Sequence, residues 1–310
     1  MHDGAAFLDQ QAAARPQVVQ AKSYQAKVEQ LWTDGLPRGS LTGWPSLDQY
    51  YTVAPGQWTL VTGYPSMGKS EFVDALAVNL SHQGWKFLVY SPENQPTSVH
   101  LAKLLEKLAG KPFGAGAGER MSLAEAQEHL ATINERFRFV QPALDSPPTI
   151  PELLEAITPE LAELSGTESV PVGVVIDPWN EVETSRQAGM SETEFVSKSL
   201  TQLRNWARHH NVHVWLVAHP QKMKRENGKL PIPTPDSVSG SAHFWNKADC
   251  ALTVHIVDRE RPEVNILVQK MRFKHLGRRG LITLRYDIST GRYRDISVLP
   301  RPITSWAGGR

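Results

Sequence analysis

The amino-acid sequence predicts an α/β fold in which helices flank a mostly parallel, twisted sheet and antiparallel β-hairpins form its C-terminal edge. Two observations lead to this prediction. From residue 57 onward, short apolar runs alternate with amphipathic stretches, and from residue 251 onward the apolar runs follow one another without a helical stretch between them. Alternating strands and helices are typical of parallel pairing, whereas consecutive strands form hairpins.

The composition is that of a globular protein. The 310 residues include 33 Lys or Arg and 32 Asp or Glu, which gives a formal net charge of +1, and 40% are hydrophobic. Such a chain can bury a large core, and its bulk is not expected to be disordered. The single cysteine, Cys250, excludes an intramolecular disulfide framework and is typical of a reducing compartment. We expect no membrane partner, because no apolar run approaches the roughly 20 residues that span a bilayer.

The helices and strands are predicted in order from hydrophobic spacing. Residues 1–12 read as a loose tail, residues 13–34 as a helix, and the Gly- and Pro-rich residues 35–57 as turns. The next elements alternate: a strand at 58–63, a helix at 70–84, a strand at 85–91, helices at 96–109, 122–136 and 150–165, a strand at 173–177, a helix at 193–210 and a strand at 212–219. A polar loop (220–243) precedes the β-rich segments at 251–257, 263–274, 280–287 and 291–296.

A phosphate-binding motif lies between the first strand and the helix that follows it. Residues 63–70 match G-x-x-x-x-G-K-[ST], and the glycines allow backbone N–H groups and the helix N-terminus to face a triphosphate. Lys69 can reach the β and γ oxygens, and the Ser70 hydroxyl can bind Mg²⁺. We expect ATP, or another NTP or dNTP, with Mg²⁺ as cofactors. The predicted nucleotide-binding residues are Gly63, Pro65, Ser66, Met67, Gly68, Lys69, Ser70 and Glu71.

Three further strand ends carry polar side chains. Asp177 follows the apolar run 172–176 and is expected, with Ser70, to hold the metal. Glu93 follows the second strand, where a carboxylate can deprotonate an attacking water. His219 ends VHVWLVAH, in a position to hydrogen-bond a γ-phosphate. Each of these residues taken alone could instead be an ordinary surface or helix-start residue.

The chain order Lys69, Glu93, Asp177, His219 resembles that of the RecA-like core of ring-shaped replicative DNA helicases. This group includes DnaB, Twinkle and the phage primase-helicases. Further matching segments are GLPRGSLTGWPSLD, YSPEN, VIDPWNE, VAHPQK, SGSAHFWNKAD and QKMRFKHLGRRG. The resemblance covers roughly 35–296 and implies a RecA-like P-loop NTPase fold. It suggests a tail and linker helix at 1–34, an ATPase and helicase domain at 35–300, and a C-terminal tail at 301–310.

The resemblance implies a homohexamer with a nucleotide at each subunit interface. It assigns Lys270 and Arg272 to the neighbour's site as piston lysine and arginine finger, and Arg259 and Tyr286 to the nucleotide base. A solvated basic edge strand is the alternative for the first pair. The resemblance also implies that the 13–34 helix docks on an adjacent subunit. Single-stranded DNA phosphates are assigned to the basic loop residues Lys222, Lys224, Arg225 and Lys229, for which a solvated charged loop is the alternative.

The resulting hypothesis is an ATP-dependent, ring-forming DNA helicase that translocates 5′→3′ on single-stranded DNA during replication. A RecA- or KaiC-type DNA-dependent ATPase and a nucleotide-dependent loading module without unwinding stay open as alternatives. A separate primase or polymerase is a further expected partner, since one cysteine cannot build the zinc site of a fused primase. We expect a cytoplasmic location in a bacterium or a phage-infected cell, with an organellar origin left open. Although the net charge is near zero, basic residues concentrate in 220–229 and 259–280.

Overall fold

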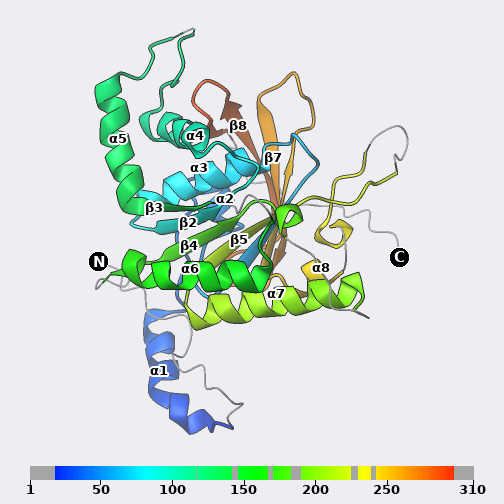
Figure 1. Cartoon of the computed structure of the whole chain (residues 1–310). Coiled ribbons are helices and arrows are strands. Elements are labelled where there is room, and N and C mark those ends of the chain that lie inside the picture. Colours follow the sequence, from blue (N-terminus) through cyan, green and yellow to red (C-terminus); the bar gives the residue numbers. More distant parts are fainter. Residues whose placement is uncertain are drawn as a thin grey trace.

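The computed structural model describes residues 18–116, 118–141, 146–166, 170–182, 190–224, 230–238 and 242–296. Within these ranges, one nine-stranded sheet runs in the order β3-β2-β4-β5-β1-β6-β7-β8-β9 and lies between two layers of helices (Figure 1). The α/β fold class predicted from the sequence is therefore confirmed.

The sheet consists of a parallel part and an antiparallel part. The parallel strands are β1 (Trp58–Thr62), β2 (Lys86–Tyr90), β3 (Phe137–Val140), β4 (Val172–Ile176), β5 (His213–Ala218) and β6 (Cys250–His255). The antiparallel strands are β7 (Glu263–Met271), β8 (Gly280–Asp287) and β9 (Arg292–Asp295). The late hairpins thus extend the parallel sheet at one edge, as the sequence predicts.

Helices cover both faces of the sheet. One layer contains α3 (Lys69–Ser81), α4 (Thr97–Ala109) and α5 (Leu123–Arg136), and the other contains α6 (Ile150–Ser165) and α7 (Glu192–His209) (Figure 1). Capping boxes fix the starts of α5, α6 and α7, where Ser122, Thr149 and Ser191 each pair with a Glu three residues later. No helix of the described residues is long and apolar enough to cross a membrane.

The remaining helical elements are short. They are the 3₁₀ turns η1 (Ala21–Tyr24), η2 (Trp179–Glu181) and η3 (Pro235–Ser237) and the helices α1 (Gln25–Asp34), α2 (Pro45–Asp48) and α8 (His243–Lys247). In Figure 1, α1 projects away from the sheet and its helix layers, and none of its residues is buried.

Sequence-based assignments differ from the structure at several places, including residues 35–57, which were predicted as turns and contain α2. The predicted helix over 13–34 is wrong at residues 18–20, which are not helical, and its residues 13–17 lie outside the described ranges. Regular α-helix begins only at Gln25. Strand β3 was not predicted, because its four residues directly follow α5 and only Phe137 is buried, so the alternation is too short to indicate a strand.

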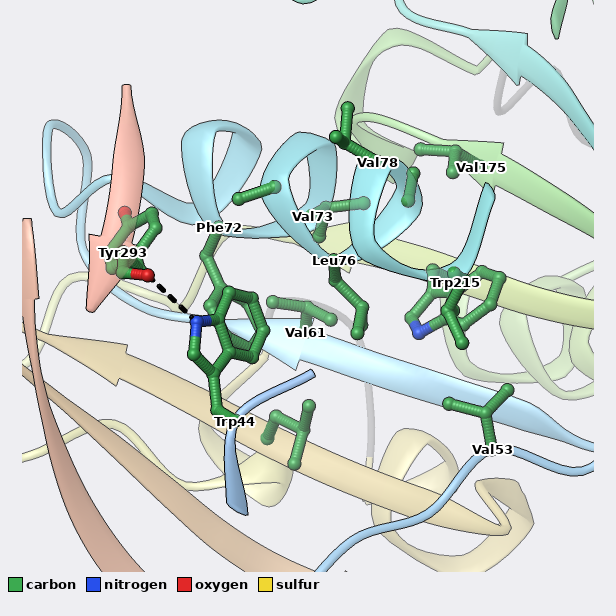
Figure 2. Close-up of a cluster of buried hydrophobic side chains, with 14 of the residues drawn as sticks. Trp44, Val53, Val61, Phe72, Val73, Leu76, Val78, Val175, Trp215 and Tyr293 are labelled. Atoms are coloured by element: carbon green, nitrogen blue, oxygen red, sulfur yellow. Dashed lines mark hydrogen bonds between the residues drawn. The ribbon is translucent and has the colours of Figure 1, made fainter. Parts of the chain in front are cut away.

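Residues from distant parts of the chain hold α3 against the sheet. The Trp44 indole stacks on Phe72 of α3 with ring centroids 5.4 Å apart, and its Nε1 donates a hydrogen bond to the Tyr293 carbonyl oxygen at 2.9 Å. Figure 2 shows these rings beside Val61 of β1 and Leu76 of α3. The helix that follows the phosphate-binding motif is therefore packed between the segment before β1 and the last strand.

The strand register aligns the carboxyl ends of four neighbouring strands. Thr62 of β1 pairs with Ala218 of β5, and Ile176 of β4 pairs with Tyr90 of β2. Because parallel strands end at the same edge of a sheet, the residues that follow them converge there. This edge is called the carboxyl edge below.

The packing of β4 generates a testable prediction about stability. A Cβ at Gly173 would lie 2.6 Å from a Phe87 ring carbon and 2.7 Å from a Trp215 ring carbon. Gly173→Ala should therefore lower the free energy of unfolding by about 1–3 kcal/mol. Gly114→Ala is the matched control, because no heavy atom of the described residues lies within 4 Å of its Cβ position. Urea unfolding of the two variants measures the difference, and equal midpoints would contradict this account of the packing.

Candidate nucleotide-binding and catalytic site

The phosphate loop (residues 63–70) has a backbone conformation that depends on glycine. At Gly63, with φ +152°, a Cβ would lie 2.4 Å from the Val254 carbonyl oxygen of β6. Gly68 has φ +78° and is the N-cap of α3. Ser66, with φ 62°, also takes the left-handed conformation. The chain thus turns closely around the N-terminus of α3, where backbone N–H groups favour an anion.

Lys69 is almost completely buried in this loop. The residue is only 5% exposed, and its Nζ donates a hydrogen bond to the Tyr64 carbonyl oxygen at 3.2 Å. Burial lowers the pKa of the Lys69 ammonium, and the charges of Asp177 and Glu93 oppose that effect. An anionic ligand would supply the charge and the acceptors that a buried ammonium lacks.

Asp177 lies directly after β4 and is 4% exposed. Burial raises the pKa of its carboxyl group to about 6, and the charges of Asp74 and Glu93 act in the same direction. A hydrogen bond with the Ser70 hydroxyl and the charge of Lys69 lower it. A hydroxyl and a carboxylate are the hard oxygen ligands that Mg²⁺ takes beside substrate phosphates, so this donor set fits the expected metal.

Glu93 and His219 face each other across the same edge. The His219 Nε2 lies 3.7 Å from Glu93 Oε1, and the His219 main-chain N–H donates to Asn180 Oδ1 at 3.1 Å. Burial and the Lys69 charge lower the pKa of His219, while Glu93 raises it. Among the described residues, the buried Nδ1 of His219 has no hydrogen-bond partner.

The side chains of Glu71 and Met67 serve the protein interior. Glu71 Oε2 accepts from Lys107 Nζ at 2.5 Å and from the Tyr286 hydroxyl at 3.4 Å, and Glu71 Oε1 lies 3.2 Å from Lys103 Nζ. The Ile256 main-chain N–H points at Met67 Sδ at 3.3 Å. Any contact of Met67 with a nucleotide would therefore come from its main chain, and the role predicted for Glu71 in nucleotide binding stays a prediction.

Of the two residues assigned to the base, one lies on a strand and the other in a turn. Tyr286 of β8 reaches the first turn of α3 through Glu71, and its ring centroid lies 5.0 Å from that of Tyr293. Arg259 is exposed in the turn between β6 and β7. The Tyr293 hydroxyl in turn donates to the Gly68 carbonyl oxygen at 3.3 Å. The β8–β9 hairpin therefore contacts the phosphate loop directly.

Lys270 and Arg272 lie at the opposite edge of the sheet. Met271 pairs with Cys250, and Cys250 pairs with Thr59 near the start of β1. Four residues of strand, or about 13 Å, separate Thr59 from the start of the phosphate loop. Arg272 Nε contacts Asp249 Oδ1 at 2.8 Å, and Lys270 Nζ donates to the Trp245 carbonyl oxygen. The structure thus does not bring this pair into the chain's own phosphate site.

The basic loop (residues 220–238) begins directly after the predicted sensor. Lys222 and Lys224 are exposed, whereas Arg225 and Lys229 lie outside the described residues. The two arms of the loop are joined at their base by an antiparallel bridge between Pro220 and Val238. The predicted DNA-contacting residues therefore follow His219 on an arm that is tied to the returning arm.

Sequence reasoning missed the residues that support the site from behind. Lys103 and Lys107 on α4 hold Glu71, and Asn180 holds the His219 main chain. Lys103 and Lys107 are four residues apart on α4, so both face α3. Charged residues at this spacing are equally common on solvated helix surfaces. Only the burial of Lys107, which is 2% exposed, distinguishes it.

The fold and the site together define a class of protein. A glycine-rich loop joins strand β1 to helix α3, a buried lysine ends the loop, and carboxylates follow two neighbouring parallel strands. This is the arrangement of a P-loop nucleoside triphosphatase, in which such a loop binds nucleotide phosphates.

Comparison with known proteins narrows this class. The family described as "AAA domain" matches residues 17–225. The Twinkle homologue of Arabidopsis thaliana, described as chloroplastic/mitochondrial, is 41% identical over an alignment of 280 residues that covers 86% of this chain and 38% of that protein. A solved ATPase domain matches with a TM-score of 0.75 at 16% identity, over 91% of this chain and all of the other. A DnaB-like replicative helicase, described with its interactions with primase, matches with 0.74 at 16% identity, over 90% of this chain and 69% of the other.

The chain belongs to the AAA domain family, and the predicted resemblance to RecA-like replicative helicase domains is confirmed. A domain of this family is a nucleotide-binding domain. The chain spans about two fifths of the length of its Arabidopsis relative. The predicted cytoplasmic location stays a prediction.

The environment of Asp177 generates a prediction about pH. In the folded protein without ligand the carboxyl keeps its proton up to about pH 6, whereas its ordinary pKa is 3.8. The unfolded chain therefore loses this proton first, and ionisation costs the folded state stability as the pH rises from about 4 to 6. Asp177→Asn should be more stable than the wild type above pH 6, by about 3 kcal/mol, and the gain should vanish near pH 4.

Chemical denaturation without nucleotide or divalent cation, at pH 4.5, 6 and 7.5, measures this difference. Asp236→Asn, which removes an exposed carboxylate, is the matched control. A wild-type protein at least as stable as Asp177→Asn at pH 7.5 would show that the carboxyl is not penalised by burial.

Proposed function

We propose that this domain is the ATP-dependent motor of a ring-forming replicative DNA helicase, which translocates 5′→3′ on single-stranded DNA. One observation carries the proposal. The phosphate loop and its carboxylates lie at the carboxyl edge of the sheet, whereas Lys270 and Arg272 lie at the other edge. A second copy of the chain is needed to bring such a pair to a triphosphate, which supports a closed ring of subunits.

The residues at the carboxyl edge support hydrolysis of a Mg²⁺-bound ATP. Lys69 would contact the β and γ oxygens, and Ser70 and Asp177 would hold the metal directly or through water. The bound metal would neutralise charge on the phosphates. Glu93, which is half exposed to solvent at 47% of its side chain, would accept the proton of the attacking water. His219, beside Glu93, would contact the γ-phosphate. Loss of this contact after hydrolysis would then change the position of the loop that follows His219.

The arrangement of Arg272 supports its action on a neighbouring subunit. Its side chain is 34% exposed, and its guanidinium is oriented by Asp249, which is completely buried. A planar cation that is held on one side and exposed on the other can stabilise the charge of a phosphoryl transfer in an adjoining site. In a hexamer each interface would then combine Lys69 of one subunit with Arg272 of the next.

The basic loop supports contact with single-stranded DNA in the ring. Lys222 and Lys224 are exposed directly behind His219, and we propose that they bind DNA phosphates together with Arg225 and Lys229. Such contacts are independent of sequence and weaken with salt. A separate primase or polymerase is proposed as a further partner, since the structurally similar DnaB-like helicase interacts with a primase.

A forked-duplex assay tests the proposed function. The wild type should unwind a fork with a 5′ single-stranded tail in the presence of ATP and Mg²⁺, and Lys69→Ala should reduce unwinding and DNA-stimulated hydrolysis to background because the cation at the phosphates is lost. Lys198→Ala, an exposed lysine on α7, is the control and should retain both activities. Strand exchange on open filaments would favour a recombinase, and negligible DNA-stimulated hydrolysis would favour a loading module.

Mixing two inactive variants tests whether Arg272 acts on the neighbour. Arg272→Ala should bind nucleotide like the wild type but lose hydrolysis by about 1,000-fold or more. When it is mixed with Lys69→Ala, some interfaces combine an intact Lys69 with an intact Arg272, so part of the hydrolysis rate should return. Capture of one variant through an affinity tag on the other confirms that mixed rings form. Mixed rings without any recovery would argue that the arginine does not act across the interface.

A further inference from the structure

The returning arm of the basic loop is fixed to the sheet by two buried side chains. The Pro233 carbonyl oxygen accepts hydrogen bonds from Thr253 Oγ1 at 3.0 Å and from Gln269 Nε2 at 2.9 Å. Thr253 lies on β6 and Gln269 on β7, and both are at most 1% exposed. These two anchors belong to strands of the core, so they tie the arm to the sheet and not to the phosphate loop.

A third contact joins the same arm to the phosphate loop. The Tyr64 hydroxyl donates a hydrogen bond to the Pro231 carbonyl oxygen at 2.9 Å. Tyr64 is the second residue of the phosphate loop, and its own carbonyl oxygen accepts the Lys69 Nζ hydrogen bond at 3.2 Å. One residue therefore contacts both the lysine expected to bind phosphate and the arm that returns from the basic loop.

The two arms of the loop are connected to each other as well. Pro220 and Val238 form a bridge, and the Gln221 main-chain N–H donates to the Ser237 carbonyl oxygen at 2.7 Å. Lys222 follows directly. A shift of the returning arm near Pro231 would consequently reach the basic side chains at the start of the loop.

We infer that Tyr64 is a positioning residue that couples the phosphate loop to the basic loop, so that nucleotide binding changes the affinity for single-stranded DNA. This inference rests on the proposed function. When a triphosphate arrives, its oxygens compete with the Tyr64 carbonyl for the Lys69 ammonium, because a charged acceptor binds more strongly than a neutral one. The Tyr64 peptide is then free to move, and its side chain moves Pro231 with it. This route is separate from His219, which follows β5 and precedes Pro220, the first residue of the first arm.

Tyr64→Phe tests the coupling, because it removes one hydroxyl and keeps the ring. The dissociation constant of a fluorescent oligo(dT) is measured on the full chain with and without a non-hydrolysable ATP analogue and Mg²⁺. The ratio of the two constants reports the coupling. In the variant this ratio should move toward 1 by about 2- to 10-fold, the effect of one hydrogen bond. Reciprocity requires that the effect of DNA on nucleotide affinity change by the same factor.

Thr253→Val is the matched control, because it removes a hydroxyl that holds the same arm from the sheet. It should change DNA affinity equally with and without nucleotide and leave the ratio at its wild-type value. Tyr64→Leu also lacks the hydroxyl and should repeat the loss seen in Tyr64→Phe. A wild-type ratio in both Tyr64 variants, or an equal loss in Thr253→Val, would overturn the inference. A wild type that binds no DNA in either state would instead refute the proposed function, on which the inference rests.

Discussion

The buried ammonium of Lys69 is the interaction around which the rest of the domain is arranged. A lone charge at 5% exposure is strongly unfavourable, and here the carboxylates of Asp177 and Glu93 offset that cost. Each of the three residues follows a different strand, so the compensation requires that β1, β2 and β4 end at the same edge of one sheet. The strand order fulfils this requirement, with β4 between β2 and β5 and β1 next to β5. The compensation is incomplete, since burial still lowers the pKa of Lys69 and raises that of Asp177. A site in that state is suited to a ligand that carries both a cation and phosphates.

A second set of charges holds this edge in place. Lys103 of α4 lies 3.2 Å from Glu71 and donates to Asn94 Oδ1 at 3.0 Å. Glu71 belongs to the first turn of α3, next to Lys69, and Asn94 belongs to the turn that carries Glu93. The same lysine therefore ties the residue expected to activate water to the helix that carries the phosphate lysine. Lys107 also pairs with Glu71, and the Lys107 side chain is almost completely buried. Such a pair fixes geometry more than it adds stability, because the Lys107 ammonium has lost its hydration.

The sequence predicted those features that depend on local spacing. Apolar runs located β1, β2, β4 and β5. The polar residues that follow these strands could be assigned to one edge because parallel strands end together; they are Lys69, Glu93, Asp177 and His219. The strand order itself is not encoded locally. Neither the contact of Tyr64 with Pro231 nor that of Glu71 with Lys107 could be foreseen, because each joins segments far apart in the chain. β3 was missed for a related reason, since an edge strand of four residues is stabilised by its partner rather than by its own pattern.

Strand β1 connects the residue that orients Arg272 to the phosphate loop. Asp249, which orients Arg272, also accepts a hydrogen bond at its Oδ2 from the main-chain N–H of Trp58 at 3.3 Å. Trp58 is the first residue of β1, and the phosphate loop begins where β1 ends. All five residues of β1 are buried between β5 and β6, so this strand cannot lengthen or tilt without disturbing the core. The position of the proposed finger relative to the chain's own phosphate site is therefore fixed.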